Sequence, residues 1–141
     1  KRIKTNHLEL EATINGVKGN FILDTGASNS CVGLDLISHF MLISEDSDIK
    51  AAGAGAIDMV TQKSENNKLK IGDWKTKKSH LVLFDLTHVN TALKQHNAKE
   101  VHGIIGADVL ELGKAIIDYN DNALYLKKTK SKKANKLQFP F

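Results

Sequence analysis

An aspartate, a threonine and a glycine directly follow a run of apolar residues near the beginning of the chain, at Asp24-Thr25-Gly26. The residues before them, Phe21 to Leu23, have the composition of a strand that is covered on both faces. Glycine lets the backbone turn sharply without a Cβ clash, which would place the carboxylate of Asp24 at the tip of a rigid loop. A carboxylate held there is suited to general acid–base catalysis, although an ordinary surface turn uses the same residue types.

A second motif, GIIGADVL, occupies residues 103–110. It predicts a buried strand with glycines at both ends, followed by a helix over residues 107–112. Asp108 is more typical of the start of a helix than of a second catalytic acid.

Small residues and glycines dominate the stretch between the two motifs, at residues 48–62, with Gly53-Ala54-Gly55 at its centre. This composition predicts a mobile hairpin whose backbone approaches another group closely, and an ordinary flexible hairpin is the alternative. A phosphate-binding loop is disfavoured because no Gly-Lys-Ser or Gly-Lys-Thr follows the glycines.

Cysteine and histidine do not indicate a metal site. The single cysteine, Cys31, excludes an intramolecular disulfide and a cysteine-only metal site, and we interpret it as a small buried hydrophobe rather than a nucleophile. The six histidines show no HExxH motif or other short spacing typical of zinc ligands.

The elements that position these residues are expected to be mostly strands. Apolar and polar residues alternate from His7 to Ile14, and Asn15-Gly16 is a typical two-residue turn, so a hairpin with Val17 to Leu23 is predicted. Further strands are expected at residues 68–71, 79–84, 103–106, 115–119 and 123–126, and helices at 33–42, 87–96 and 107–112. The expected fold class is mainly β with two or three short helices.

Length and composition fit one domain of ordinary globular type. The chain has 141 residues, of which 41% are hydrophobic and 26% charged, and it contains no apolar run of the about 18 residues that cross a bilayer. Its net charge of +4 lies in residues 127–136, because subtracting the six lysines found there leaves −2. We therefore expect one domain at 1–126 and a flexible basic tail at 127–141, with contact of this tail with a membrane surface or a polyanion as the less favoured interpretation.

The two motifs and the glycine-rich stretch between them resemble the retropepsin-like aspartic proteases, the family of the retroviral proteases and their bacterial relatives. The resemblance rests on DTGAS at 24–28 and GIIGADVL at 103–110, and it covers most of residues 7–126. It implies a small β-barrel that corresponds to one half of an acid protease. It also implies an enzyme that hydrolyses peptide bonds and needs no metal or cofactor.

Roles for individual residues also follow from this resemblance. Asp24 matches the catalytic aspartate, Thr25 the threonine that hydrogen-bonds across a two-fold axis, and Gly26 the glycine that offers its backbone to substrate. Residues Gly53, Ala54 and Gly55 match the flap that closes over a peptide, and Ile105 and Gly106 the segment packed behind the loop.

The chain departs from the retroviral members of this family at two positions of the site. Ser28, which ends the loop after Ala27, stands where those members usually carry an acidic residue, and Ala107 stands where they carry an arginine. Both halves of a supporting ion pair are therefore missing, and we expect a hydrogen bond through Ser28 in its place. Retroviral substrate preferences consequently cannot be transferred.

Aspartic proteolysis needs two carboxylates, one ionised and one protonated, whereas Asp-Thr-Gly occurs once in this chain. A homodimer in which Asp24 faces its symmetry mate would supply both. The expected function is therefore a homodimeric aspartic endopeptidase, acting on extended peptides, with no nucleic acid partner. The alternatives are a catalytically silent peptide-binding module of the same fold and a tethering domain that works through the basic tail. An extracytoplasmic location is favoured if an N-terminal signal has been removed, and a cytoplasmic one otherwise.

Overall fold

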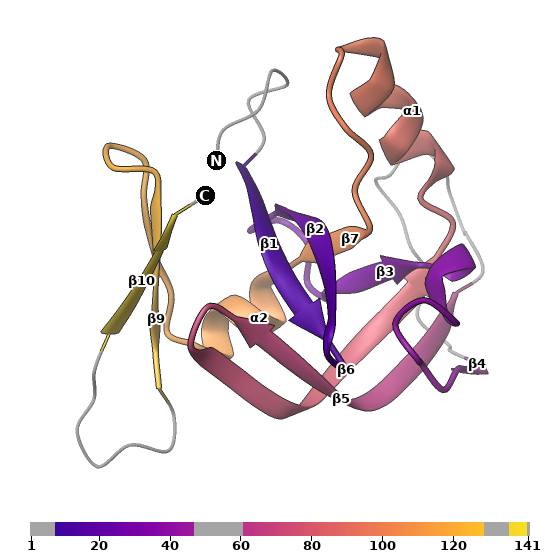
Figure 1. Ribbon diagram of the computed structural model, residues 1–141, viewed down its shortest axis with the longest axis horizontal. Helices are drawn as coiled ribbons and strands as arrows, with labels where there is room; N and C mark the ends of the chain where they lie inside the picture. Colours follow the sequence, from indigo (N-terminus) through magenta and orange to yellow (C-terminus); the bar gives the residue numbers. More distant parts are fainter. Residues whose placement is uncertain (1–7, 47–60, 129–135, 141) are drawn as a thin grey trace.

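The computed structural model describes residues 8–46, 61–128 and 136–140 (Figure 1). Strands predominate in these ranges, and they are accompanied by two α-helices and one short 3-10 helix at Leu34–Leu36. The strands are β1 (Leu8–Ile14), β2 (Val17–Leu23), β3 (Cys31–Gly33), β4 (Glu45–Asp46), β5 (Gln62–Ile71), β6 (Trp74–Phe84), β7 (Gly103–Ile105), β8 (Ile116–Asp118), β9 (Ala123–Lys127) and β10 (Lys136–Pro140). The helices are α1 (Thr87–Gln95) and α2 (Ala107–Leu112).

Six of the strands form a closed barrel. The larger sheet has the order β1-β2-β7-β3-β6-β5-β4, and β1 also pairs with β5, so the sheet closes on itself with β4 attached outside the ring. Closure leaves the ring without unpaired strand edges. The pairs β2–β7 and β3–β6 are parallel, and the remaining pairs are antiparallel. The prediction of a mainly β fold with a small barrel is confirmed.

The β1–β2 hairpin forms as its sequence predicts. Asn15 and Gly16 have φ values of 51° and 86°, the left-handed conformations that a two-residue turn between twisted strands requires. The alternation in β1 places Leu8, Leu10 and Ile14 in the core, each at most 5% exposed. The second strand of this hairpin, β2, is part of the barrel wall and ends beside β7.

The expected helix at residues 33–42 is largely absent. Only Leu34–Leu36 forms a single 3-10 turn, and Met41 has a left-handed φ of 55° at the end of the turns that follow. The apolar residues of this segment nevertheless contribute to the core, because Phe40 is fully buried and Ile37 packs against the cluster that contains it. Apolar residues at helical spacing are thus buried here by consecutive turns rather than by a helix.

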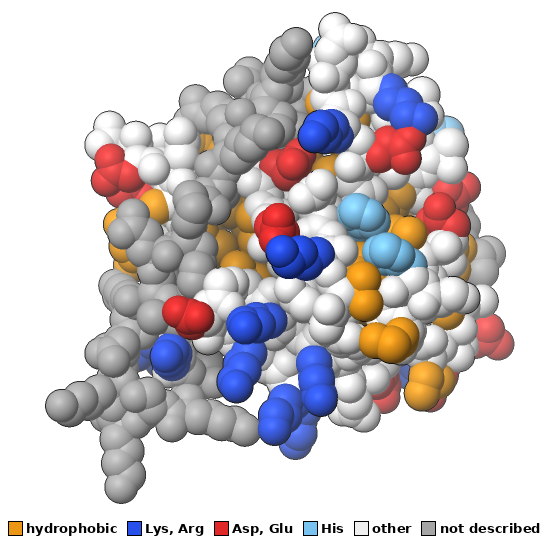
Figure 2. Space-filling model, in the orientation of Figure 1, with side chains coloured by type: hydrophobic (Ala, Val, Ile, Leu, Met, Phe, Trp, Pro, Cys, Tyr) orange, Lys and Arg blue, Asp and Glu red, His pale blue; other side chains and the backbone are white. Residues whose placement is uncertain are grey.

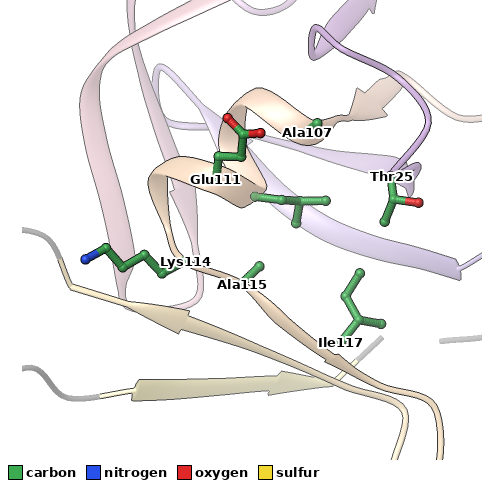
Figure 3. Close-up of a pocket in the computed structure, with 7 residues that line it drawn as sticks. Thr25, Ala107, Glu111, Lys114, Ala115 and Ile117 are labelled. Carbon is green, nitrogen blue, oxygen red and sulfur yellow. The ribbon is translucent and has the colours of Figure 1, made fainter.

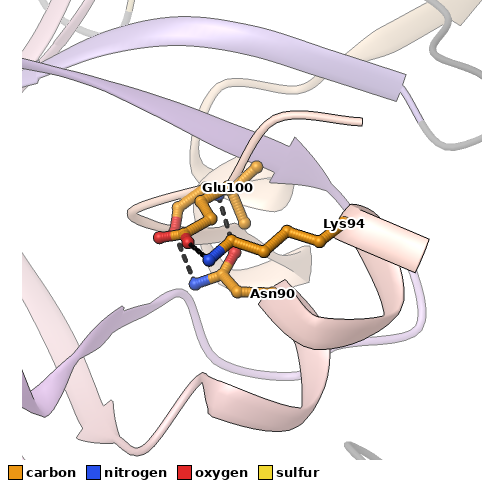
Figure 4. Close-up of polar contacts among 4 residues, drawn as sticks. Asn90, Lys94 and Glu100 are labelled. Atoms are coloured by element: carbon orange, nitrogen blue, oxygen red, sulfur yellow. Dashed lines mark hydrogen bonds and ion pairs between the residues drawn. The ribbon is translucent and has the colours of Figure 1, made fainter. Parts of the chain in front are cut away.

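Side-chain contacts of α1 fix the segment that leads into β7 (Figure 4). The amide of Asn90 accepts from the N–H of Val101 at 2.7 Å and donates to the carbonyl of the same residue at 3.1 Å. Lys94 of α1 forms an ion pair with Glu100. Next in the chain, His102 accepts from the backbone N–H of Asn20 through Nδ1 at 2.9 Å. The approach to β7 is therefore held against both α1 and β2.

A second, three-stranded sheet of order β10-β9-β8 lies beside the barrel. The indole N–H of Trp74, which is itself buried in the barrel, donates to the carbonyl of Lys127 at 3.2 Å and joins the two units. Strand β10 lies within residues 127–141, where the sequence suggested only a basic tail. Among the described residues, no helix has the length and apolar character needed to cross a membrane.

Candidate active site

Asp24 is the first residue after strand β2. Leu23 pairs with Ile105 of the parallel strand β7, and the backbone N–H of Asp24 donates to the carbonyl of Ile105 at 2.9 Å. Both partners in that pair are buried, at 6% and 1% exposed, whereas Asp24 itself is exposed. The sequence thus places an accessible carboxylate on a rigid strand end.

Hydrogen bonds within the turn orient this carboxylate. The N–H of Gly26 donates to Oδ1 of Asp24 at 2.9 Å, and the N–H of Ala27 donates to the Asp24 carbonyl at 3.2 Å. Such a turn fixes the side chain relative to the backbone, because Oδ1 accepts from a group two residues away. Thr25 and Ser28 are exposed on the same loop.

Gly106 allows the loop of residues 24–28 to pack against the end of β7. The N–H of Ala107 donates to the carbonyl of Ala27 at 2.7 Å, which brings the two backbones together. A Cβ at position 106 would lie 2.6 Å from the carbonyl oxygen of Ala27 and 3.1 Å from that of Asn29. Glycine is required here because a side chain would collide with the loop that carries Asp24.

Replacing Gly106 with alanine should therefore displace the loop. We expect Gly106→Ala to lower the free energy of unfolding by about 2 kcal/mol, as overpacking of a close contact typically does, and to reduce peptide cleavage with it. Chemical denaturation and initial cleavage rates measure the two effects. Gly16→Ala is the matched control because a Cβ there meets no atom within 4 Å, although its φ of 86° adds local strain. Loss of stability in Gly106→Ala no greater than in this control would contradict the packing argument.

Ser30 and Asp108 connect the far end of the same loop to α2. Both carboxylate oxygens of Asp108 accept from the N–H of Ser30 at 3.0 Å, and Oδ1 also accepts from the Ser30 hydroxyl at 2.7 Å. The hydroxyl in turn accepts from the N–H of Gly106 at 2.8 Å. Ser30 is fully buried, whereas Asp108 is partly exposed. We call this set of bonds the Ser30–Asp108 clamp.

The clamp corrects the expectation for Ser28. That side chain is exposed and forms no hydrogen bond with any other described residue, because the loop turns it toward solvent. The cross-link that the sequence suggested at Ser28 is made instead by Ser30, two residues further on. Asp108 lies in the first turn of α2, as predicted, and in addition accepts the bonds of the clamp.

An open groove of about 320 Å³ lies next to Thr25 (Figure 3). The side chain of Thr25 lies across it from Ile117, and α2 forms the remaining wall. The lining residues are Thr25, Ala107, Leu110, Glu111, Lys114, Ala115 and Ile117. This groove therefore connects the loop of residues 24–28 with α2 and the start of the smaller sheet.

Cys31 follows the clamp but is not a reactive group. Burial raises the pKa of its thiol to about 12, and only 4% of the residue is exposed. The thiol is therefore protonated and packed among Val82, Phe84 and Leu86, as the sequence suggested. Over the described ranges, no three His, Cys, Asp or Glu side chains are grouped so that they could hold a metal ion.

The structure brings most of the predicted site residues together. The loop of residues 24–28 lies directly against Ile105 and Gly106. The predicted flap residues Gly53, Ala54 and Gly55 lie outside the described residues, and their role stays a prediction. Sequence reasoning missed Ser30, whose only signal was a small polar residue just before a buried strand.

A model of the aspartyl protease family matches residues 10–109, which include both motifs and the barrel. The chain belongs to the aspartyl protease family. The matched region includes Asp24 at the end of β2 and the loop of residues 24–28 that packs against β7. No curated protein sequence matches the chain significantly.

Solved structures of retropepsin-like proteins share this fold. The retroviral protease-like domain of Ddi1 from Leishmania major has a TM-score of 0.57 at 16% identity, with 93% of this chain and 94% of that chain covered. EIAV protease, in complex with the inhibitor HBY-793, has a TM-score of 0.56 at 18% identity and covers 74% of this chain and 86% of its own. A retropepsin-like aspartic protease from Rickettsia conorii has a TM-score of 0.55 at 18% identity, with 83% and 80% covered. The retropepsin-like architecture predicted from the sequence is confirmed.

Proposed function

We propose that this chain is an aspartic endopeptidase that hydrolyses extended polypeptides as a homodimer. The observation that carries the proposal is the exposed carboxylate of Asp24, fixed at the end of a buried strand in the only Asp-Thr-Gly of the chain. Water activated between Asp24 and its symmetry mate attacks the peptide carbonyl. One carboxylate acts as the base, and the other, protonated, polarises the carbonyl oxygen.

Electrostatics explain why two copies of Asp24 would share one proton. Two negative charges about 3 Å apart repel by about 5 kcal/mol at an effective dielectric of about 20. That energy corresponds to about four pKa units, so the pair retains one proton over a broad acidic to near-neutral range. The resulting pKa values belong to the dyad rather than to either aspartate.

The surroundings of Thr25 support a second copy as the missing partner. Thr25 is exposed beside the groove lined by α2 and Ile117, which is open on one side. Two apolar side chains, Leu112 and Ile116, are adjacent in sequence to residues that line this groove, and they are 46% and 44% exposed. A symmetry-related chain placed over this region would cover these side chains and bring the two Asp24 loops face to face.

Substrate would bind as an extended strand between the loop and the flap predicted at residues 53–55. The described residues on either side of the segment 47–60 support this assignment, because Asp46 of β4 pairs directly with Gln62 of β5. Main-chain hydrogen bonds then supply affinity, while pockets for side chains determine the preferred cleavage site. No metal or cofactor takes part in the proposed reaction.

Titration with a peptide mimic of the tetrahedral intermediate tests this function. The mimic carries a hydroxyl group in place of the scissile carbonyl. We expect it to bind at least about 100-fold more tightly than the corresponding substrate peptide, because only an assembled dyad recognises the transition state. Specific activity should also rise with protein concentration. Equal affinity for mimic and substrate, with no cleavage, would instead indicate the catalytically silent peptide-binding module.

A further inference from the structure

Five exposed lysines lie together on strands β5 and β6. Lys70 and Lys75 are direct cross-strand partners, and Lys68 lies opposite Lys77 and Lys78, where β6 contains one extra residue. Like charges placed directly opposite each other destabilise a sheet. The five charges together exceed the net charge of the whole chain, which is +4. We call these five residues the basic face.

The basic face points outward from the barrel, and the described residues form no ion pair with it. Leu69 and Ile71, the neighbours of Lys70, are each 1% exposed, so Lys70 lies on the opposite, solvent side of the strand. Within the described part of the chain, no carboxylate oxygen lies within 4.0 Å of any of the five ammonium groups. Figure 2 shows the blue side chains gathered in the lower part of the molecule, where β5 and β6 lie in Figure 1.

The same row of charge continues across the barrel wall. Thr13 of β1 pairs with Lys70 on one side and with Lys18 on the other, so Lys18, Lys70 and Lys75 lie along one line across four strands. Lys18 is partly balanced by Glu11, at 3.7 Å.

We propose that the basic face docks the protein onto a membrane surface that contains anionic lipids. A row of lysines along one side of a sheet presents its charges to a planar partner, and a lysine near an anionic leaflet contributes attraction without needing a specific geometry. Specific recognition of nucleic acid is disfavoured because it uses arginine forks on base edges and stacking aromatic side chains. The basic face contains neither, and the single arginine of the chain is Arg2.

Docking through this face leaves the active site accessible. Lys18 and Asp24 are six residues apart on and just beyond the extended strand β2, which corresponds to about 20 Å. The two positions lie at opposite ends of β2, so the loop with Asp24 is well separated from Lys18 along the strand. The inference does not depend on the proposed proteolysis, because binding is measured without substrate.

Flotation with lipid vesicles tests the proposal. The chain of residues 1–141 is mixed with vesicles of phosphatidylcholine alone or with about 30% phosphatidylserine, and bound protein is measured at low salt and at about 0.5 M salt. We expect binding only to the anionic vesicles at low salt. The variant Lys70→Gln/Lys75→Gln should bind about 30-fold more weakly, since one lysine near an anionic leaflet contributes about a factor of five.

The matched control is Lys94→Gln/Lys99→Gln, which removes two exposed lysines at α1 and the segment after it and should weaken binding by less than about twofold. An equal loss in both double variants would show that net charge alone drives binding and would overturn the proposal. Loss confined to Lys130→Gln/Lys132→Gln/Lys133→Gln would assign the contact to the lysine-rich segment at 127–136 and would overturn the proposal. Binding of a random DNA duplex, but not of vesicles, would identify nucleic acid as the partner and equally overturn the proposal.

Discussion

Replacing Asp24 with asparagine is expected to abolish peptide cleavage while leaving the fold intact. Loss of the base that activates water should lower kcat by about 10⁴-fold, the upper end of the range for a general base. The amide oxygen of asparagine can still accept the N–H of Gly26, which donates to Oδ1 at 2.9 Å in the native loop. Because the side chain is exposed, the free energy of unfolding should change by less than about 0.5 kcal/mol.

Cleavage of an unfolded protein substrate, together with denaturant unfolding, measures both effects. The control is Asp73→Asn, which makes the same chemical change at an exposed residue in the β5–β6 turn. This control should retain full activity. Cleavage by Asp24→Asn at the native rate would exclude Asp24 as the catalytic residue and, with it, the proposed mechanism.

The second large effect is expected from breaking the Ser30–Asp108 clamp. In Asp108→Ala, the N–H and hydroxyl of the fully buried Ser30 lose a charged acceptor, which should lower the free energy of unfolding by about 3 kcal/mol. The end of the loop that carries Asp24 is also released from α2. Misplacement of catalytic groups typically costs about 100-fold in rate, so kcat should fall even under conditions where the variant remains folded.

Asp108→Asn is the informative companion because its amide oxygen can still accept one hydrogen bond from Ser30. It should recover part of both the stability and the kcat. A double-mutant cycle with Ser30→Ala separates the clamp from independent effects, since the loss in the double variant should be smaller than the sum of the single losses. Strict additivity would show that the two residues do not act together.

Several elements of this fold are predictable because their signals are local. The Asn15-Gly16 turn between two alternating segments specifies the first hairpin, and the GIIGADVL motif specifies β7 and α2. The beginning of β5 was not predicted, because residues 62–67 are all polar. Two of them, Ser64 and Asn67, are nevertheless buried and hydrogen-bond to each other at 3.0 Å. Because the buried residues of this segment are polar and bond to each other, its sequence shows no hydrophobic periodicity that would indicate a strand.

The least predictable features join distant parts of the chain. Barrel closure depends on Thr13 and Ile14 pairing with Lys70 and Leu69, and no local pattern specifies that register. The clamp likewise joins Ser30 to Asp108, which are separated by 78 positions. The sequence indicated Asp24 as the candidate catalytic carboxylate, whereas the groups that hold its loop became visible only in three dimensions.

Mixing native chains with Asp24→Asn chains tests the shared dyad most directly. The two proteins are unfolded, combined in equal amounts and refolded together, and cleavage is compared with the same total amount of native protein. If each active unit needs Asp24 from two chains, random pairing leaves about one quarter of the activity. Activity of about one half would mean that each chain works alone, and would contradict the proposed homodimeric protease.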